Sequence, residues 1–223
     1  RFMVIIDDAV VLSKTDFKEN DRLISLYSKE HGRIAVRFPR VNKPNSKLKA
    51  FCEPFTQACY RIYYRRNADI GSGTGGKIIS VFAGIRKDYK KTSLALEFCQ
   101  FAKRLTPEHQ PNILKYNLLV ESLKEVEAVS QIDSRYFYMY SCAFVLRFMH
   151  TAGFGLDKPV LGLSKAFWDK IHNTPLSEIS FENEEQETLD KTRYIVNRFL
   201  ERYLDKPLQN IHEYNTQKAT SKS

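Results

Sequence analysis

The chain has 223 residues, of which 43% are hydrophobic and 13% aromatic, so it can bury a real core and is not globally disordered. Lysine and arginine number 35 against 26 acidic residues, which gives a formal net charge of +9. The surplus is uneven: residues 1–91 hold 19 Lys and Arg and 9 acids, a net +10, whereas residues 92–223 carry −1. A basic surplus confined to one segment favours a positive surface with an anionic partner.

Hydropathy and cysteine spacing indicate the cellular compartment. No apolar run approaches the roughly 18–20 residues of a membrane-spanning helix. The apolar start, Phe2–Ile6, breaks at Asp7 and is too short for a signal-peptide core. The four cysteines are scattered without a CxxC pair, which favours reduced thiols over disulfides or a structural zinc. We therefore expect a soluble cytoplasmic protein without a membrane association.

The first 90 residues show the period-two alternation of short strands, separated by turn residues. The predicted strands cover residues 3–12, 22–28, 33–38, 55–65 and 77–84. Because no long helix separates them, five short strands favour a small closed barrel over a parallel sheet.

Basic residues recur on one face of two of these strands and in the loop between them. Alternation puts Arg33 and Arg37 on a common face of one strand, and Arg61, Tyr63 and Arg65 on a common face of another. The polar loop of residues 39–49 adds Arg40, Lys43, Lys47 and Lys49.

From residue 92 the hydrophobic spacing becomes helical. The most apolar stretch, 132–152, is hydrophobic on nearly every face and predicts a buried central helix that Gly153 ends. Ser164 is a candidate N-cap for a short helix. The other predicted helices cover residues 92–106, 112–126 and 184–204. We expect a strand domain at 1–88, a helical domain at 89–213 and a flexible tail at 214–223.

The segment Gly71–Lys77 has the spacing of a phosphate-binding loop, with four residues between a glycine and Gly-Lys. The next residue, however, is Ile78, where Mg²⁺ coordination needs a hydroxyl, and a strand pattern follows where a helix is required. We interpret the segment as a flexible hairpin connection. A phosphate-transfer enzyme remains the weaker alternative, which predicts stabilisation by ATP that Lys77→Ala removes.

Other signatures of catalysis are missing from the sequence. The five histidines show no HExxH or comparable ligand spacing, and no local motif singles out a Ser or Cys nucleophile. We expect no enzymatic activity, no catalytic residues, no cofactor and no metal site.

The basic segment is the strongest functional signal. Residues 33–91 hold 14 Lys and Arg and 3 acids, interleaved with phenylalanines and tyrosines. Sites for single-stranded nucleic acids combine a positive groove for phosphates with aromatic faces for bases. The competing interpretation is that the tyrosines are core and the lysines solvate a loop. For Arg61, Tyr63 and Arg65, packing against the helical domain is a further alternative.

Short motifs occur along the whole chain in an informative order. In the first part they are Ala9–Leu12, Glu19–Leu23, Glu30–Ile34, Ser46–Lys49 and Pro54–Thr56. In the second part, 144–154 reads Phe-x-Leu-Arg-Phe-Met-x-x-Ala-Gly-Phe, and 198–208 ends in Lys-Pro-Leu. Their order and spacing resemble the RecO family of bacterial DNA repair and recombination mediators.

The resemblance implies an α+β protein with an N-terminal OB-fold barrel followed by an α-helical domain. RecO proteins bind single-stranded and double-stranded DNA and anneal complementary strands. With RecR they help to load RecA onto DNA covered by single-strand-binding protein, whose acidic C-terminal tail they can contact. We therefore expect DNA, RecR and that tail as partners, RecA as an indirect partner, and a place at the bacterial nucleoid.

The resemblance also bears on individual residues. Basic residues of the OB domain contact DNA in this family, which carries over to Arg33, Arg37, Lys47 and Lys49. In the family, the segment that 144–154 resembles reads Phe-x-Leu-Arg-Leu-Leu-x-x-Leu-Gly-Tyr, and many members carry a four-cysteine zinc site just after it. Residues 154–164 contain no cysteine here, so we expect no zinc finger. The predicted DNA-binding residues are Arg33, Arg37, Arg40, Lys43, Lys47, Lys49, Arg61, Tyr63 and Arg65.

The main rival function is an RNA-binding or ribosome-associated module built on an OB fold, because a basic barrel with aromatic residues suits either nucleic acid. Competition between DNA and RNA of the same sequence separates the two.

Overall fold

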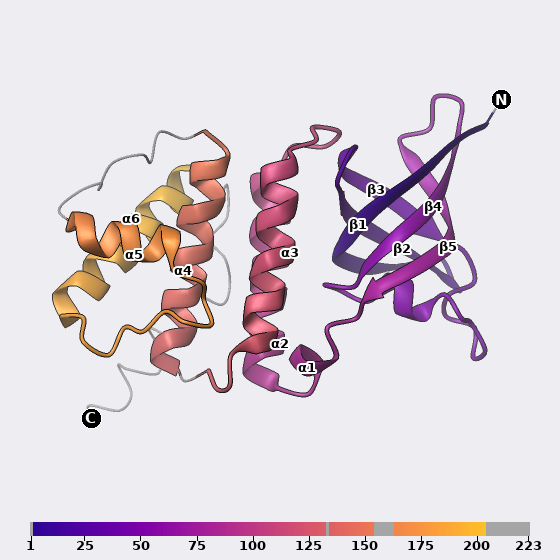
Figure 1. The fold of residues 1–223 in the computed structure, drawn as a ribbon. Helices are drawn as coiled ribbons and strands as arrows, with labels where there is room; N and C mark the ends of the chain where they lie inside the picture. Colours follow the sequence, from indigo (N-terminus) through magenta and orange to yellow (C-terminus); the bar gives the residue numbers. More distant parts are fainter. Residues whose placement is uncertain (1, 133, 154–162, 204–223) are drawn as a thin grey trace. The chain divides into compact units, whose positions relative to one another are not determined.

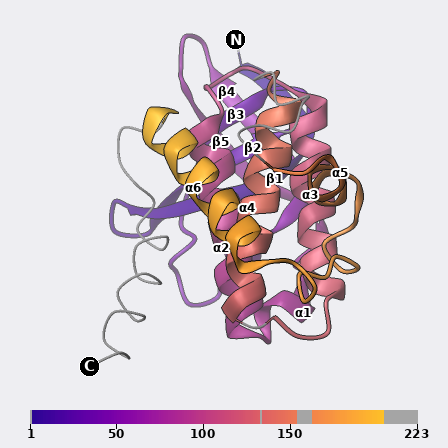
Figure 2. The same ribbon diagram turned by 90° about the vertical axis from the view of Figure 1, so that its left-hand side faces the viewer.

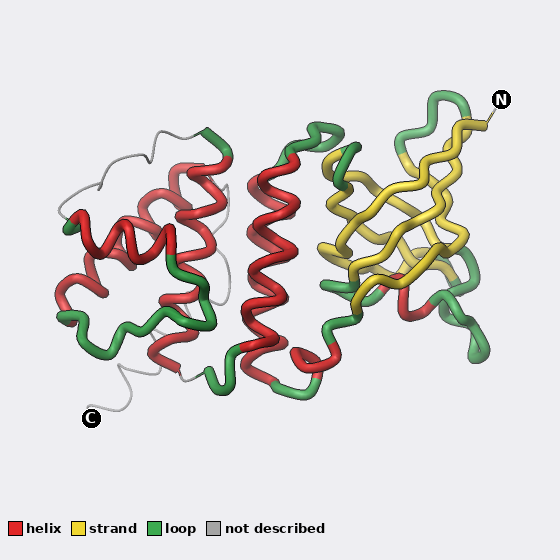
Figure 3. The backbone as a smooth tube through the Cα atoms, viewed as in Figure 1, coloured by secondary structure: helices red, strands yellow, loops and turns green. Residues whose placement is uncertain are grey.

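The structure is a computed structural model that describes residues 2–132, 134–153 and 163–203. The chain divides into two compact units, residues 1–129 and 130–223. Figure 1 shows the elements of both units, coloured along the sequence, and Figure 3 separates helices from strands.

Five strands of the first unit close into a barrel in the order β1-β2-β3-β5-β4. Neighbouring strands are antiparallel except for β3 and β5, which are parallel. A closed five-stranded barrel with this order is an OB fold, so the predicted fold class is confirmed. The strands are β1 (Phe2–Phe17), β2 (Asp21–Ser28), β3 (Gly32–Phe38), β4 (Gln57–Arg65) and β5 (Ile70–Ser80).

The length of β1 allows the barrel to close. Its first part pairs with β4, from Phe2 opposite Arg65 onward, and its second part pairs with β2. The register shifts between Val11 and Ser13. A bulge bends a strand and increases its twist, so one long strand can serve both neighbours.

The glycine-rich segment is a strand, and the predicted flexible hairpin connection is wrong. Gly71 and Gly73 lie in the first half of β5 and are buried. A Cβ on Gly73 would lie 2.3 Å from the Phe38 ring, and one on Gly71 would lie 2.5 Å from Ile62. The glycines therefore make room for large side chains inside the barrel. The predicted last strand is displaced as well, because β5 ends at Ser80.

Three helices complete the first unit. They are α1 (Ala83–Arg86), α2 (Tyr89–Leu105) and α3 (Ile113–Ala128). Asp88 and Asn112 cap α2 and α3, each side chain accepting a hydrogen bond from the backbone N–H three residues on. Helix α2 packs on β1 and β2 and against α3, which lies beside it (Figure 1). The Cys99 thiol on α2 lies 3.6 Å from the Val11 carbonyl oxygen.

The second unit contains α4 (Ser134–Thr151), α5 (Lys165–Asn173) and α6 (Gln186–Tyr203). Figure 2 shows α6 crossing α4, and α4 contacts both other helices. The buried α4, its stop at Gly153 with φ +79° and the Ser164 cap confirm the sequence predictions. The predicted tail, 214–223, lies outside the described residues. In the part of the chain that the structure describes, no helix has the length and apolar character needed to cross a membrane.

The two compact units do not coincide with the expected domains, 1–88 and 89–213. The division falls after residue 129 because α2 and α3 pack with the barrel. Helical spacing marks where the strands end, but the sequence does not show which neighbour a helix packs against.

Candidate nucleic-acid interface

The predicted contact residue Arg33 serves a structural purpose. Its Nε donates to the Thr106 carbonyl oxygen at 2.9 Å, and its guanidinium forms an ion pair of 2.9 Å with Glu108. Only 21% of the side chain is exposed. Arg33 therefore holds the connection between α2 and α3 against β3.

The same connection covers neighbouring parts of the outer face of β2 and β3. Tyr27 is fully buried there, and its hydroxyl lies 3.4 Å from the Asn112 carbonyl oxygen. At Gly32 an added Cβ would lie 2.5 Å from the Gln110 backbone. This face is the usual oligonucleotide site of OB folds, and here part of it is closed by the protein's own chain.

Arg37 is bound to an acid on the adjacent strand. Its Nε donates to Asp21 Oδ2 at 2.7 Å, and the backbone N–H of Arg40 donates to the other carboxylate oxygen at 2.9 Å. The hydrogen bond from Arg40 and the Arg37 charge lower the pKa of Asp21. Arg37 is still 41% exposed, so one side of its guanidinium faces solvent.

The loop between β3 and β4 presents a cluster of cations. All four are exposed, and no ion pair among the described residues involves them. They are Arg40, Lys43, Lys47 and Lys49. A short 3₁₀ turn, η1 (Lys49–Cys52), ends this basic loop.

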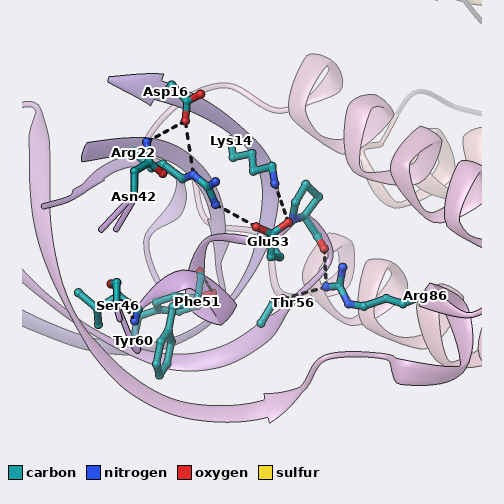
Figure 4. Close-up of polar contacts among 12 residues, drawn as sticks. Lys14, Asp16, Arg22, Asn42, Ser46, Phe51, Glu53, Thr56, Tyr60 and Arg86 are labelled. Carbon is teal, nitrogen blue, oxygen red and sulfur yellow. Dashed lines mark hydrogen bonds and ion pairs between the residues drawn. The ribbon is translucent and has the colours of Figure 1, made fainter. Parts of the chain in front are cut away.

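The basic loop is anchored to the barrel along its length. Val41 is fully buried, and the Asn42 backbone N–H donates to the Asn20 carbonyl oxygen at 3.0 Å. Further on, the Tyr60 hydroxyl inside the barrel donates to the Phe51 carbonyl oxygen at 2.9 Å (Figure 4). The exposed cations are therefore carried on a fixed backbone.

Glu53, just after the basic loop, holds two other cations in place. It accepts from Lys14 at 2.6 Å and from Arg22 at 2.9 Å, and Arg22 also pairs with Asp16 at 3.5 Å (Figure 4). Partial burial of Glu53 opposes ionisation, but the hydrogen bonds and charges of Lys14 and Arg22 lower its pKa overall. These two cations serve the fold.

The predicted face of β4 is open in the structure. Arg61 and Arg65 are exposed and Tyr63 is half-buried, and all three alternate with the barrel-facing residues of the strand. Arg61 lies opposite Ile6 of β1, and Tyr63 lies opposite Val4. The alternative that this face packs against the helical domain stays a prediction, since it concerns the second unit as well.

A groove of about 380 Å³ runs beside this face. It is lined by Ile6, Cys59, Tyr60, Arg61, Thr74, Gly75, Gly76 and Lys77. Sequence reasoning treated Lys77 only as part of a rejected phosphate loop and passed over Arg66, which is exposed at the end of β4. Alternation from the exposed Ser72 and Thr74 puts Lys77 on the inner face, and the register shift that sets Gly76 opposite Tyr60 turns it outward, so no signal in the sequence marked its position.

No metal centre emerges from the described residues, where no group of three or more His, Cys, Asp or Glu side chains is placed to hold an ion. The four cysteines are free. The position of the family's zinc site, 154–162, lies outside the described residues, so the expectation of no zinc finger stays a prediction.

Comparison with known proteins assigns the family. The family model for the N-terminal part of recombination protein O matches residues 3–82, and the model for its C-terminal part matches residues 86–158. The DNA repair protein RecO of Bacillus subtilis is 30% identical over 126 residues, 56% of this chain and 49% of that protein. The DNA repair protein RecO of Pelotomaculum thermopropionicum is 32% identical over 117 residues, 52% of this chain and 45% of that protein.

The matched region spans about half the length of these curated relatives. The two family models cover consecutive segments of the chain and meet where the last strand gives way to the first helix. The closed barrel with the strand order of an OB fold corresponds to the first match, and helices α2, α3 and α4 lie in the second. The chain therefore belongs to the RecO family.

Proposed function

We propose that this chain is a non-enzymatic DNA-binding mediator of DNA repair and recombination, which binds single-stranded and double-stranded DNA and anneals complementary strands. One observation carries the proposal: the basic loop of an OB barrel presents four exposed cations that pair with no acid of the described residues. The names of the relatives, DNA repair proteins, support the same role.

The mechanism follows from electrostatics. Two DNA strands repel each other through their phosphates, and a surface that neutralises phosphates lowers that repulsion and releases condensed counterions. Because the backbone of the basic loop is anchored to the barrel, little loop freedom is lost when DNA binds. Binding of this kind needs no bond-making chemistry, which is why we propose no enzymatic role.

The finer role rests on family resemblance. We propose that the protein acts with RecR to help load RecA onto DNA covered by single-strand-binding protein, contacts the acidic tail of that protein, and works in the cytoplasm at the nucleoid. The helical second unit is the candidate for protein contacts, because the unpaired cations that carry the DNA proposal lie in the first unit.

The test is charge removal in the basic loop with a matched control. We expect Lys43→Gln, Lys47→Gln and Lys49→Gln together to lower affinity for a labelled oligonucleotide about tenfold or more at low salt, measured by fluorescence anisotropy. The control removes three exposed lysines of the same unit elsewhere, Lys29, Lys87 and Lys90, again to glutamine.

Equal losses in the two triple variants would contradict the assignment of the site to the basic loop. The same titration with an RNA competitor of identical sequence addresses the rival function, since an RNA-binding module would prefer the RNA.

A further inference from the structure

We infer that a single DNA strand lies across the outer face of β1, β4 and β5, through the groove beside Arg61 and Lys77, and that this face distinguishes single strands from duplexes. The inference rests on the proposed function and adds to it a path for the strand and a basis for selectivity. The first reason is exclusion, because Arg33 and Tyr27 are engaged by the protein's own chain on part of the usual β2–β3 face.

The charges of the groove suit a phosphate backbone. Arg61 and Lys77 are both exposed, and no ion pair among the described residues involves either. Asp8 and, more weakly, Asp7 are the acids that act on Cys59 at one side of the groove. Desolvation raises the pKa of the Cys59 thiol and the two acids raise it further, so this thiol is neutral and adds no negative charge to the groove. Neither acid lines the groove, whereas Arg61 and Lys77 do.

Gly76 exposes backbone in the groove, beside the buried Gly75. Gly76 has φ +152°, and a Cβ there would lie 1.9 Å from the Cys59 carbonyl oxygen, so no other residue fits. Gly75 has φ +113°. A glycine in a strand interior marks a place where a ligand or another backbone approaches closely. Here Gly76 lies against the Cys59 backbone and lines the groove with exposed main chain.

The basic loop packs close to the strand segment that lines the groove. A Cβ on Gly75 would lie 3.4 Å from Leu48 and 4.0 Å from Phe51. Leu48 stands between Lys47 and Lys49, both exposed. The loop that carries these lysines therefore adjoins β5 at Gly75, one of the residues that line the groove.

Exposed apolar side chains lie along the same face and explain the selectivity. Ile6 is 60% exposed and Val4 48%, although apolar strand residues of this size are usually covered. Val4 pairs with Tyr63, and Ile6 pairs with Arg61. A single strand can lay its bases on an aromatic ring and aliphatic surface, whereas a duplex keeps its bases stacked inside.

The test uses two double variants of the full chain and two probes. The probes are a labelled oligothymidylate of about 20 nucleotides and a duplex of the same length. We expect Ile6→Ser with Tyr63→Ser to lower affinity for the single strand about fivefold or more and to leave duplex affinity within about twofold. Arg61→Gln with Lys77→Gln should weaken single-strand binding at least as much, whereas Lys29→Gln with Lys90→Gln changes it little.

A second measurement needs no variant and remains decisive if a substitution impairs folding. Photocrosslinking of wild-type protein to an oligonucleotide that carries 5-iodouracil should attach the base within residues 57–65, at Tyr63, as located by mass spectrometry. A crosslink confined to another part of the chain would overturn the inference.

The outcomes separate this inference from the proposed function. If wild type and both groove variants bind the single strand equally well, the path is wrong and DNA binding by the basic loop stands. If wild type binds neither probe, the proposed function itself fails. If the groove variants keep DNA affinity but lose binding to polyglutamate, the outer face of β1, β4 and β5 binds an acidic polypeptide instead of DNA, and the inference is overturned.

Discussion

Acidic side chains determine which cations of the first unit remain available to a ligand. Arg33 is held by Glu108, and Arg37 is held by Asp21. Glu53 engages two more cations beside the basic loop. The lysines of that loop have no such partner among the described residues. The positions of a few carboxylates therefore decide which cations serve the fold and which can bind phosphate.

Removal of the Glu53 carboxylate should destabilise the protein in a pH-dependent way. We expect Glu53→Gln to lower the free energy of unfolding by about 1–2 kcal/mol at neutral pH, discounted for partial exposure. Because the folded pKa of Glu53 is lowered, its contribution is complete above the ordinary value of 4.5 and is lost as pH falls through the folded value. Denaturant unfolding of wild type and variant at several pH values measures the difference.

The matched control is Glu19→Gln, since Glu19 is exposed and no ion pair among the described residues involves it. A difference between wild type and Glu53→Gln that stays constant from neutral pH to pH values well below 4.5 would contradict this account.

The steric role of Gly73 gives a second prediction at this scale. Gly73→Ala should cost about 1–3 kcal/mol of stability, because the added methyl group overlaps the Phe38 ring. Adding Phe38→Leu should recover part of the loss, which thermal or chemical denaturation can measure. Ser72→Ala, on the outer face of the same strand, is the control. No recovery in the double variant would show that the strain has another source.

At the scale of elements, periodicity located most strands and helices, and it failed where packing overrides composition. Glycines are poor strand formers, so Gly71–Gly76 resembled a loop, yet their missing side chains are what the barrel interior needs beside Phe38. The faces of β3 and β4 were predicted correctly from alternation. The outer face of β3 is partly covered, whereas that of β4 is exposed. The cover comes from the connection after α2, which returns to β3 and pairs with Arg33 through Glu108, 75 residues further along the chain.

The contact of Arg33 with that connection should be structural. We expect Arg33→Gln to lower the free energy of unfolding by about 1–2 kcal/mol, since two hydrogen bonds to a charged group are lost. Oligonucleotide affinity, corrected for folded fraction, should stay within about threefold, because this cation is already paired. Denaturation and anisotropy on the same sample give both values. A large loss of affinity in a fully folded variant would place Arg33 in the interface instead.

At the scale of the whole molecule, the basic part of the sequence, residues 1–91, consists of the barrel, α1 and the start of α2. Both the family and the fold class could be predicted from the sequence. The sequence could not predict that the compact unit extends to residue 129. Val10 and Leu12 are buried without belonging to the barrel core, and α2 packs on their strand. The barrel therefore depends on helices that belong by sequence to the next domain.

That dependence predicts how fragments behave. A fragment of residues 1–129 should unfold cooperatively and keep oligonucleotide binding, whereas residues 1–88 should be much less stable because Tyr27 and Leu12 lose their cover. Circular dichroism during denaturation distinguishes the two. Equal stability of both fragments would show that the barrel is independent of α2 and α3.

The central claim is that DNA contacts the cations of the basic loop and does not contact Arg33 of β3, which is paired with Glu108. The salt dependence of oligonucleotide affinity tests it most directly, because its slope counts the phosphates that a protein neutralises, at about 0.7 per contact for single strands. With Lys43, Lys47 and Lys49 changed to glutamine, the slope should fall by about 2, whereas Arg33→Gln should leave it unchanged. An unchanged slope in the loop variant, or a reduced one in Arg33→Gln, would contradict the account.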